Sequence, residues 1–117
     1  MEYMLMLHVN EAGWPELTKA QQEQGMAAYK AYTEALAKAG VLKGNNRLAS
    51  SATATTVRIA NGKAQVLDGP YSESKEQIGG YYLIDVPDLD AAISWAQKCP
   101  GASHGVVEIR AIPAMWG

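Results

Sequence analysis

The chain has 117 residues, of which 48% are apolar and 19% are charged, with a formal net charge of −2. These values exclude disordered and fibrous proteins, and they suit a single globular domain over residues 1–117, long enough for one core and too short for two. The ten Lys and Arg residues are scattered singly, whereas a nucleic-acid-binding surface needs clustered cations. We therefore expect no nucleic-acid partner.

The cysteine content and the first residues bear on the cellular compartment. Cys99 is the only cysteine, and a lone thiol that cannot form an intrachain disulfide is typical of a reducing compartment. Residues 1–10, MEYMLMLHVN, have no basic start and no small-residue cleavage site, and their apolar run is too short to span a bilayer. We expect a cytoplasmic protein without a membrane segment.

The first third of the chain reads as a strand followed by a helix. Residues 3–9 alternate with the period of a strand, and the two faces comprise Tyr3, Leu5, Leu7 and Val9 on one side and Met4, Met6 and His8 on the other. A helix is predicted over residues 15–39, because Thr18 and Gln21 have capping-box spacing and Gly40 supplies a stop. Residues 41–51 show little periodicity and are expected to form an exposed connection.

A β-hairpin is predicted near the middle of the chain. Residues 53–60 are rich in β-branched side chains, and Asn61 and Gly62 follow as a strong two-residue turn signal. Residues 64–68 are then the returning strand.

The last third contains a strand, a helix and a final strand. The apolar run 78–86 ends at Pro87, and Asp88 or Asp90 is expected to cap a second helix. The predicted apolar stripe of that helix comprises Leu89, Ala92, Ile93 and Ala96. Residues 105–112 form the last predicted strand.

This element order predicts an α+β protein of the ferredoxin-like, split βαβ class, with an added edge strand and an antiparallel sheet backed by two helices. The expected sheet order is 105–112, 3–9, 78–86, 64–68 and 53–60.

Two helices cover one face of such a sheet, yet the opposite face also carries apolar side chains. These are Met4, Met6, Leu83 and Val106. Exposed apolar patches of this size are rare on monomers, and a homodimer that packs sheet to sheet would cover the patch on both copies. A monomer with an open ligand-binding groove is the alternative.

The segment from Asp68 to Ala92, DGPYSESKEQIGGYYLIDVPDLDAA, closely resembles the signature of the DGPF family, a branch of the YCII-related proteins. Tyr71 replaces the Phe of that signature, and Ser74 replaces its Thr. The end of the first predicted helix and the final Val-Glu-Ile-Arg strand are also similar to the family. The resemblance implies a dimeric α+β barrel, in which two ferredoxin-like sheets face each other and enclose a cleft.

The resemblance also implies two functions. YCII-related proteins include an enzyme that removes chloride from a chlorinated muconolactone, which implies a cofactor-independent enzyme of the isomerase, lyase or dehalogenase type. Its substrate would be a small polar carbonyl compound or lactone, bound in the intersheet cleft. Other relatives are labelled as transcription-initiation proteins, which implies a non-enzymatic binding or regulatory module associated with an alternative sigma factor.

The expected sheet order gathers chemically active side chains at one rim, with Arg110 further along the last strand. They are His8, Asp68, Tyr71, Glu73, Lys75, Tyr81 and His104. Proton abstraction beside a carbonyl needs a base and a cation or phenol for the developing oxyanion. We expect His8 and Asp68 to be catalytic, and the substrate-binding residues to be Tyr71, Lys75, Tyr81 and Arg110.

Several of these residues also have a structural interpretation, and Lys75 suits a solvated loop edge as well. His8 suits a satisfied interface histidine, and Asp68 suits a turn in which its carboxylate accepts from backbone donors. Glu108 and Arg110 alternate on one face and suit an intersubunit ion pair as well as a substrate clamp.

Two His residues far apart and one Cys show no zinc-ligand spacing, so we predict no metal and no other cofactor. Gly79 and Gly80 precede a strand, which suits a bulge or a close chain approach and not a nucleotide-binding turn.

The loop over residues 68–76 is longer than a hairpin between neighbouring strands requires. We expect it to fold over one end of the cleft and to bring Asp68 within hydrogen-bond reach of backbone or of His8.

Overall fold

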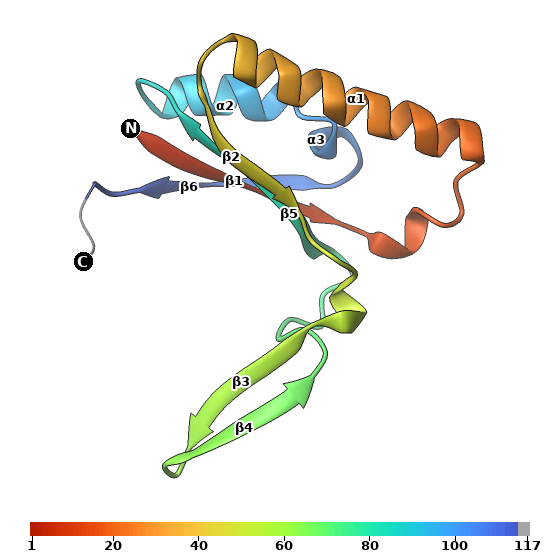
Figure 1. The fold of residues 1–117 in the computed structure, drawn as a ribbon, viewed down its shortest axis with the longest axis vertical. Helices are drawn as coiled ribbons and strands as arrows, with labels where there is room; N and C mark the ends of the chain where they lie inside the picture. Colours follow the sequence, from red (N-terminus) through yellow and green to blue (C-terminus); the bar gives the residue numbers. More distant parts are fainter. Residues whose placement is uncertain (115–117) are drawn as a thin grey trace.

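The computed structural model describes residues 1–114 and has the expected ferredoxin-like α+β fold. Its main sheet is antiparallel and four-stranded, in the order β2-β5-β1-β6. The strands are β1 (Glu2–Val9), β2 (Leu42–Arg47), β5 (Gln77–Asp85) and β6 (Val106–Ile112), and the helices are α1 (Lys19–Lys38), α2 (Leu89–Lys98) and the short α3 (Gly101–His104). All three helices lie on one side of the sheet (Figure 1).

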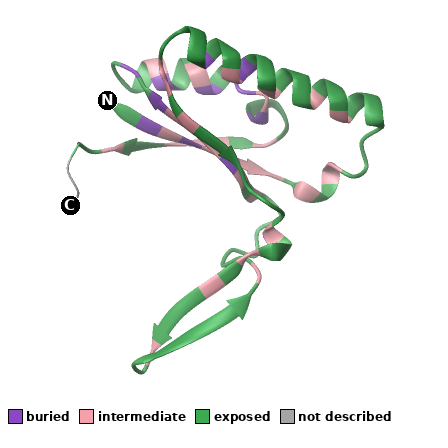
Figure 2. Cartoon of the chain, in the orientation of Figure 1, coloured by how far each residue is buried: buried purple, intermediate pink, exposed green. Residues whose placement is uncertain are grey.

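The core fills the space between the sheet and the helices. β1 alternates as predicted, since Tyr3, Leu5 and Leu7 are buried while the residues between them are half-buried. Leu36 of α1 and Ile84 of β5 are completely buried beside them. Figure 2 shows the buried residues gathered in this one layer.

The helix ends follow their sequence signals. Thr18 and Gln21 form the predicted capping box at the start of α1, and Gly40 follows α1 with a φ of +75°. Asp88 caps α2, because its side chain accepts from the Ala91 backbone N–H at 2.9 Å.

The predicted stripe of α2 was wrong in two of its four positions. Ala92 and Ala96 are buried, but Leu89 and Ile93 are exposed. The buried line instead runs through Ala92 and Ala96 to Cys99, and all three belong to the core cluster.

The segment predicted as an exposed connection is an edge strand. β2 pairs with β5, with Asn45 opposite Tyr82 and Asn46 opposite Tyr81. It occupies the position expected for residues 64–68, so that expected sheet order was wrong. The polar, Gly- and Asn-containing sequence of β2 hid the strand, since an edge strand has little to bury and shows no clear period.

Two short 3-10 helices, η1 (Glu11–Gly13) and η2 (Ser51–Thr53), precede α1 and the hairpin. The hairpin is formed by β3 (Thr55–Ala60) and β4 (Lys63–Asp68), joined by the predicted turn, in which Asn61 and Gly62 have φ values of +51° and +74°. Within residues 1–114 these strands pair only with each other.

The hairpin therefore does not extend the main sheet, contrary to expectation. In Figure 1 it projects away from the body of the protein, on the side of the sheet opposite the helices. The radius of gyration of the Cα atoms is 16.2 Å, whereas a compact chain of this length has a radius of about 13 Å. The chain is thus an extended molecule with a projecting arm.

Candidate functional site

The face of the sheet that points away from the helices combines apolar and charged side chains. β1 contributes Met4, Met6 and His8, all half-buried, and β6 contributes Glu108 and Arg110. We refer to this surface as the open face.

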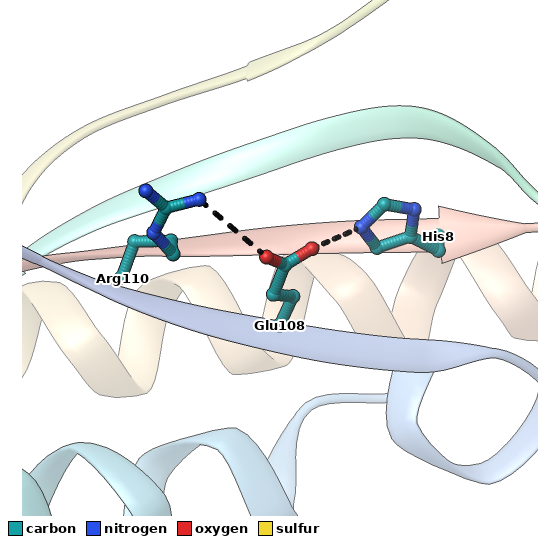
Figure 3. Close-up of polar contacts among 3 residues, drawn as sticks. All are labelled: His8, Glu108 and Arg110. Carbon is teal, nitrogen blue, oxygen red and sulfur yellow. Dashed lines mark hydrogen bonds and ion pairs between the residues drawn. The ribbon is translucent and has the colours of Figure 1, made fainter. Parts of the chain in front are cut away.

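His8, Glu108 and Arg110 form a polar row across the open face (Figure 3). His8 Nε2 lies 2.9 Å from Glu108 Oε1, and Arg110 Nη1 lies 3.8 Å from Glu108 Oε2. Glu108 is paired in register with Met6, and His8 with Val106, so the carboxylate reaches His8 along the diagonal between neighbouring strands. The carboxylate thus lies between an imidazole and a guanidinium.

The contact with Glu108 defines what the His8 ring can do. An ionised carboxylate only accepts hydrogen bonds, so it favours the tautomer in which Nε2 carries the proton. The other ring nitrogen, Nδ1, then holds a free lone pair when the ring is neutral. A carboxylate that orients an imidazole in this way is a recurring arrangement for general-base chemistry.

A cavity of about 530 Å³ opens beside His8. Three segments line it together with His8. They are residues 48–54 before β3, residues 70–72 of the loop 68–76, which we call the signature loop, and residues 76–78 at the start of β5. Tyr71 is among the lining residues. His8 and Tyr71 of the signature loop therefore line the same cavity, as expected from the sequence.

The signature loop is anchored on the base of the hairpin. Gly69 N–H donates to the Ala54 carbonyl at 2.7 Å, and the Thr56 hydroxyl donates to the Gly69 carbonyl at 2.7 Å. The Arg58 guanidinium lies 5.9 Å from the centre of the Tyr71 ring, within the range of a cation–π contact. Tyr71 and the arm form one unit.

The structure does not bring Asp68 to His8. Asp68 is the exposed last residue of β4, opposite Thr55, and within residues 1–114 its carboxylate accepts no hydrogen bond. The expectation of a contact with His8 depended on β4 lying beside β5, a place that β2 occupies. Glu108 is the carboxylate that contacts His8.

The other predicted site residues are more widely spread. Tyr81 lies opposite Met6 on the open face, and its hydroxyl accepts from Asn46 Nδ2 at 2.7 Å. Lys75 lines a neighbouring hollow of about 540 Å³ that shares Ser51 and Gln77 with the cavity beside His8. His104 lies in α3, where its Nε2 is 3.4 Å from the Tyr29 hydroxyl.

Glu108 and Glu11 were not predicted as site residues from the sequence. Glu108 was considered only in a pair with Arg110, although strand alternation places it on the same face as His8 once β6 is paired with β1. Glu11 holds η2 in place, because its carboxylate accepts from the backbone N–H of Ser51 at 3.0 Å and from the Ser51 hydroxyl at 2.9 Å. No spacing signal in the sequence links positions 11 and 51.

The Gly79–Gly80 pair forms the predicted bulge and close approach. The register between β1 and β5 shifts between Leu7 and His8. A Cβ atom on Gly79 would lie 2.8 Å from a Val9 methyl, and one on Gly80 would lie 2.9 Å from the Asn46 carbonyl oxygen. The bulge brings His8 opposite Ile78, which lines the cavity.

Burial favours the neutral form of three titratable groups in or beside the core, Tyr29, Tyr32 and Cys99. Burial raises the pKa of Tyr29 to about 12, and it raises the pKa of Tyr32 still further. Burial also raises the pKa of the Cys99 thiol, which disfavours the nucleophilic thiolate. Among the described residues no group of three His, Cys, Asp or Glu side chains is arranged to hold a metal ion.

The comparison with known proteins identifies the family. The YCII-related domain matches residues 1–115, and the chain belongs to this family. An uncharacterised protein of Rhizobium meliloti (strain 1021) is 34% identical over 112 residues, which cover 94% of this chain and 90% of that protein. In the part of the chain that the structure describes, none of the helices combines the length and the apolar character that a membrane crossing requires.

Proposed function

We propose that this protein is a cofactor-independent enzyme of the isomerase, lyase or dehalogenase type, acting on a small polar carbonyl compound or lactone. The observation that carries the proposal is the 2.9 Å contact between His8 and Glu108 at the edge of a cavity that the signature loop lines. Membership of the DGPF branch, which the signature residues 68–76 support, and a cytoplasmic location are parts of the same proposal.

In the proposed reaction His8 is the general base and Glu108 is a positioning residue. The Nδ1 lone pair takes a proton from the carbon next to the substrate carbonyl, and the electron pair of that C–H bond moves to the carbonyl oxygen as an enolate. Tyr71 on the cavity wall and Arg110 on the open face are the candidate donors for that oxygen. Return of the proton to another carbon gives isomerisation, and loss of a leaving group gives elimination.

The proposal is tested with a panel of small lactones and carbonyl acids in deuterated water. Exchange of the proton next to the carbonyl, followed by NMR, should occur with the wild type and stop with His8→Ala. Glu108→Gln keeps the shape of the side chain but removes its charge, so exchange should fall, by at most the roughly 10²- to 10⁴-fold that general acid–base catalysis contributes. Glu34→Gln, the same substitution at an exposed position of α1 on the other side of the sheet, should leave the rate unchanged.

The competing function is a non-enzymatic binding or regulatory module with an alternative sigma factor as partner. Binding of panel compounds without any proton exchange, unaffected by Glu108→Gln, would contradict the enzyme. Co-purification with a sigma factor in that case would favour the module.

We further propose that two copies pair through their open faces and enclose the ligand between the sheets. Met4, Met6 and Leu83 on this face are half-buried apolar side chains, and Val106 is exposed, so a second copy would remove them from water. Met6→Asp should give a monomer in sedimentation equilibrium, because it would bury an unpaired charge. Met26→Asp on the exposed surface of α1 is the matched control and should leave a dimer. A wild type that is monomeric at 100 µM, a concentration chosen at roughly a hundredfold above a micromolar dissociation constant, would contradict the dimer.

A further inference from the structure

The hairpin has one mainly apolar face and one mixed face. The register places Val57 opposite Val66 and Ile59 opposite Ala64 on the apolar face, while Arg58 opposite Gln65 and Thr56 opposite Leu67 lie on the other. Val57, Ile59 and Val66 are 62%, 67% and 63% exposed. Figure 2 shows almost the whole hairpin as exposed.

A hairpin with an exposed apolar face is unusual on the surface of a protein. A two-stranded hairpin on its own is only marginally stable in water, and the gathering of β-branched apolar side chains on one face is typical of strands with that face covered. Within residues 1–114, each hairpin strand also leaves one edge unpaired. The apolar face therefore lacks the layer that its sequence pattern implies.

We propose that the apolar face of the hairpin packs against a second copy of this chain, so that each copy holds the other with its hairpin. This inference depends on the homodimer proposed above. Figure 1 shows the hairpin on the open-face side of the sheet, and along the viewing direction the Cα atoms span only 17 Å. A copy that packs on the open face is therefore flanked by the hairpin.

The dimensions agree with this placement. Packed sheets lie about 10 Å apart, and a strand of six residues is about 20 Å long. A hairpin that projects from the open-face side can thus reach past the partner's sheet to the elements behind it.

The contact area supports the same occupant. Four strands about 4.8 Å apart, each about 24 Å long, give the open face a flat footprint of about 450 Å². A specific interface buries about 800 Å² on each partner. The hairpin adds about 200 Å² of footprint at the same spacing, on the same side of the molecule, which brings the contact surface closer to that area.

Docking of the hairpin would also complete the cavity beside His8. The signature loop is bonded to the base of β3 through Gly69, and Arg58 of β3 contacts Tyr71. A hairpin held by a partner thus holds Tyr71 at the cavity wall. The hairpin would thus contact an apolar surface of the second copy. As a result, the ligand site beside His8 would be fully ordered only in the dimer.

Val66→Asp and Gln65→Asp test the inference, because they add the same charge at neighbouring positions on opposite faces of β4. In sedimentation equilibrium, Val66→Asp should raise the dimer dissociation constant at least 10-fold, and Gln65→Asp should change it less than about 2-fold, as expected for a solvated rim charge. Val66→Thr keeps the β-branched shape and strand preference, so weakening by this variant as well would show that lost apolar contact, and not an unfolded hairpin, is the cause.

Hydrogen exchange of the wild type supplies a second measurement. The amides of residues 55–68 should become more protected as the protein concentration rises through the dissociation constant. Equal protection in monomer and dimer, or a Val66→Asp protein that dimerises as well as the wild type, would overturn the inference.

The outcomes separate this inference from the proposals on which it builds. If Met6→Asp splits the dimer and Val66→Asp does not, the open-face dimer stands and the hairpin contact is wrong. If the wild type is a monomer, both are wrong. The catalytic role of His8 is judged by the exchange rate of Glu108→Gln at a concentration where sedimentation shows this variant to be dimeric.

Discussion

In the core sheet and in the hairpin, strands place apolar side chains on one face. That face is buried in the core sheet and exposed in the hairpin. β1 alternates apolar and half-buried positions, and Leu5 is completely buried under the helices. β3 and β4 also place apolar side chains on one face, yet Val57 and Val66 are mostly exposed. Alternation thus predicts that one face of a strand pair will be covered, but it does not say which part of which molecule covers it.

The two regions also differ in how their strands are paired. β1 has β5 on one side and β6 on the other, and α1 and α2 pack over it. Each hairpin strand has one neighbour among the described residues. Regions with few buried contacts open at lower free energy than the core does, so the hairpin and the core should respond differently to equivalent substitutions.

The largest difference is expected from removal of apolar side chains. Leu36→Ala removes a completely buried side chain and should lower the free energy of unfolding by about 3 kcal/mol. Val66→Ala should lower it by less than about 0.5 kcal/mol in a monomer, because the side chain is already exposed there. Urea unfolding of both variants in the Met6→Asp background measures the two effects without the contribution of dimerisation. Similar losses for the two would show that the hairpin packs on its own chain.

A smaller difference is expected for tyrosine hydroxyls. The Tyr32 hydroxyl donates to the Trp95 carbonyl at 2.8 Å in the core, so Tyr32→Phe should lower the free energy of unfolding by about 1 to 2 kcal/mol. Tyr71 in the signature loop is 78% exposed, and Tyr71→Phe should change stability by less than about 0.5 kcal/mol. Thermal melts of both variants at neutral pH give this comparison.

The Tyr32 hydroxyl also makes stability depend on pH above pH 10. Because the folded pKa of Tyr32 is raised above its ordinary value of 10.0, the unfolded chain loses this proton first. The contribution of the neutral phenol is therefore fully present below pH 10 and declines as the pH rises above it. Tyr32→Phe should weaken the fall in stability above pH 10, and an unchanged alkaline slope would contradict the role of this phenol.

The sequence predicted the local elements better than their arrangement. The capping box at Thr18, the cap at Asp88 and the turn at Asn61 were all found, because each depends on residues within a few positions of each other. β2 was missed, because the polar sequence of an edge strand resembles a loop. The hairpin was then assigned to the vacant edge of β5, which shows how one missed strand displaces another.

In the candidate site, too, predictions from local signals held better than those that depended on strand order. His8 and Tyr71 were predicted to lie near each other, and both line one cavity. The carboxylate beside His8 was misassigned to Asp68, because that choice depended on the order of strands and not on a local signal. Glu108 could have been found from the pairing of β6 with β1, since both His8 and Glu108 point away from the helices.

The smallest difference is expected from two glycines that share one backbone conformation. Gly40 follows α1 with a φ of +75°, and Gly62 forms the hairpin turn with a φ of +74°. A Cβ atom added at either position meets nothing within 4 Å, so substitution by alanine carries only the backbone cost of a left-handed residue, about 1 kcal/mol. Gly40→Ala should lower the free energy of global unfolding by that amount, because Leu36 before it belongs to the core and Val41 after it packs against the core. Gly62→Ala should leave global unfolding unchanged and lower the free energy of local opening of residues 55–68, measured by hydrogen exchange, by the same amount. If Gly62→Ala instead lowers global stability as much as Gly40→Ala does, the hairpin and the core unfold as one unit, and the contrast between the two regions lies only in their exposure.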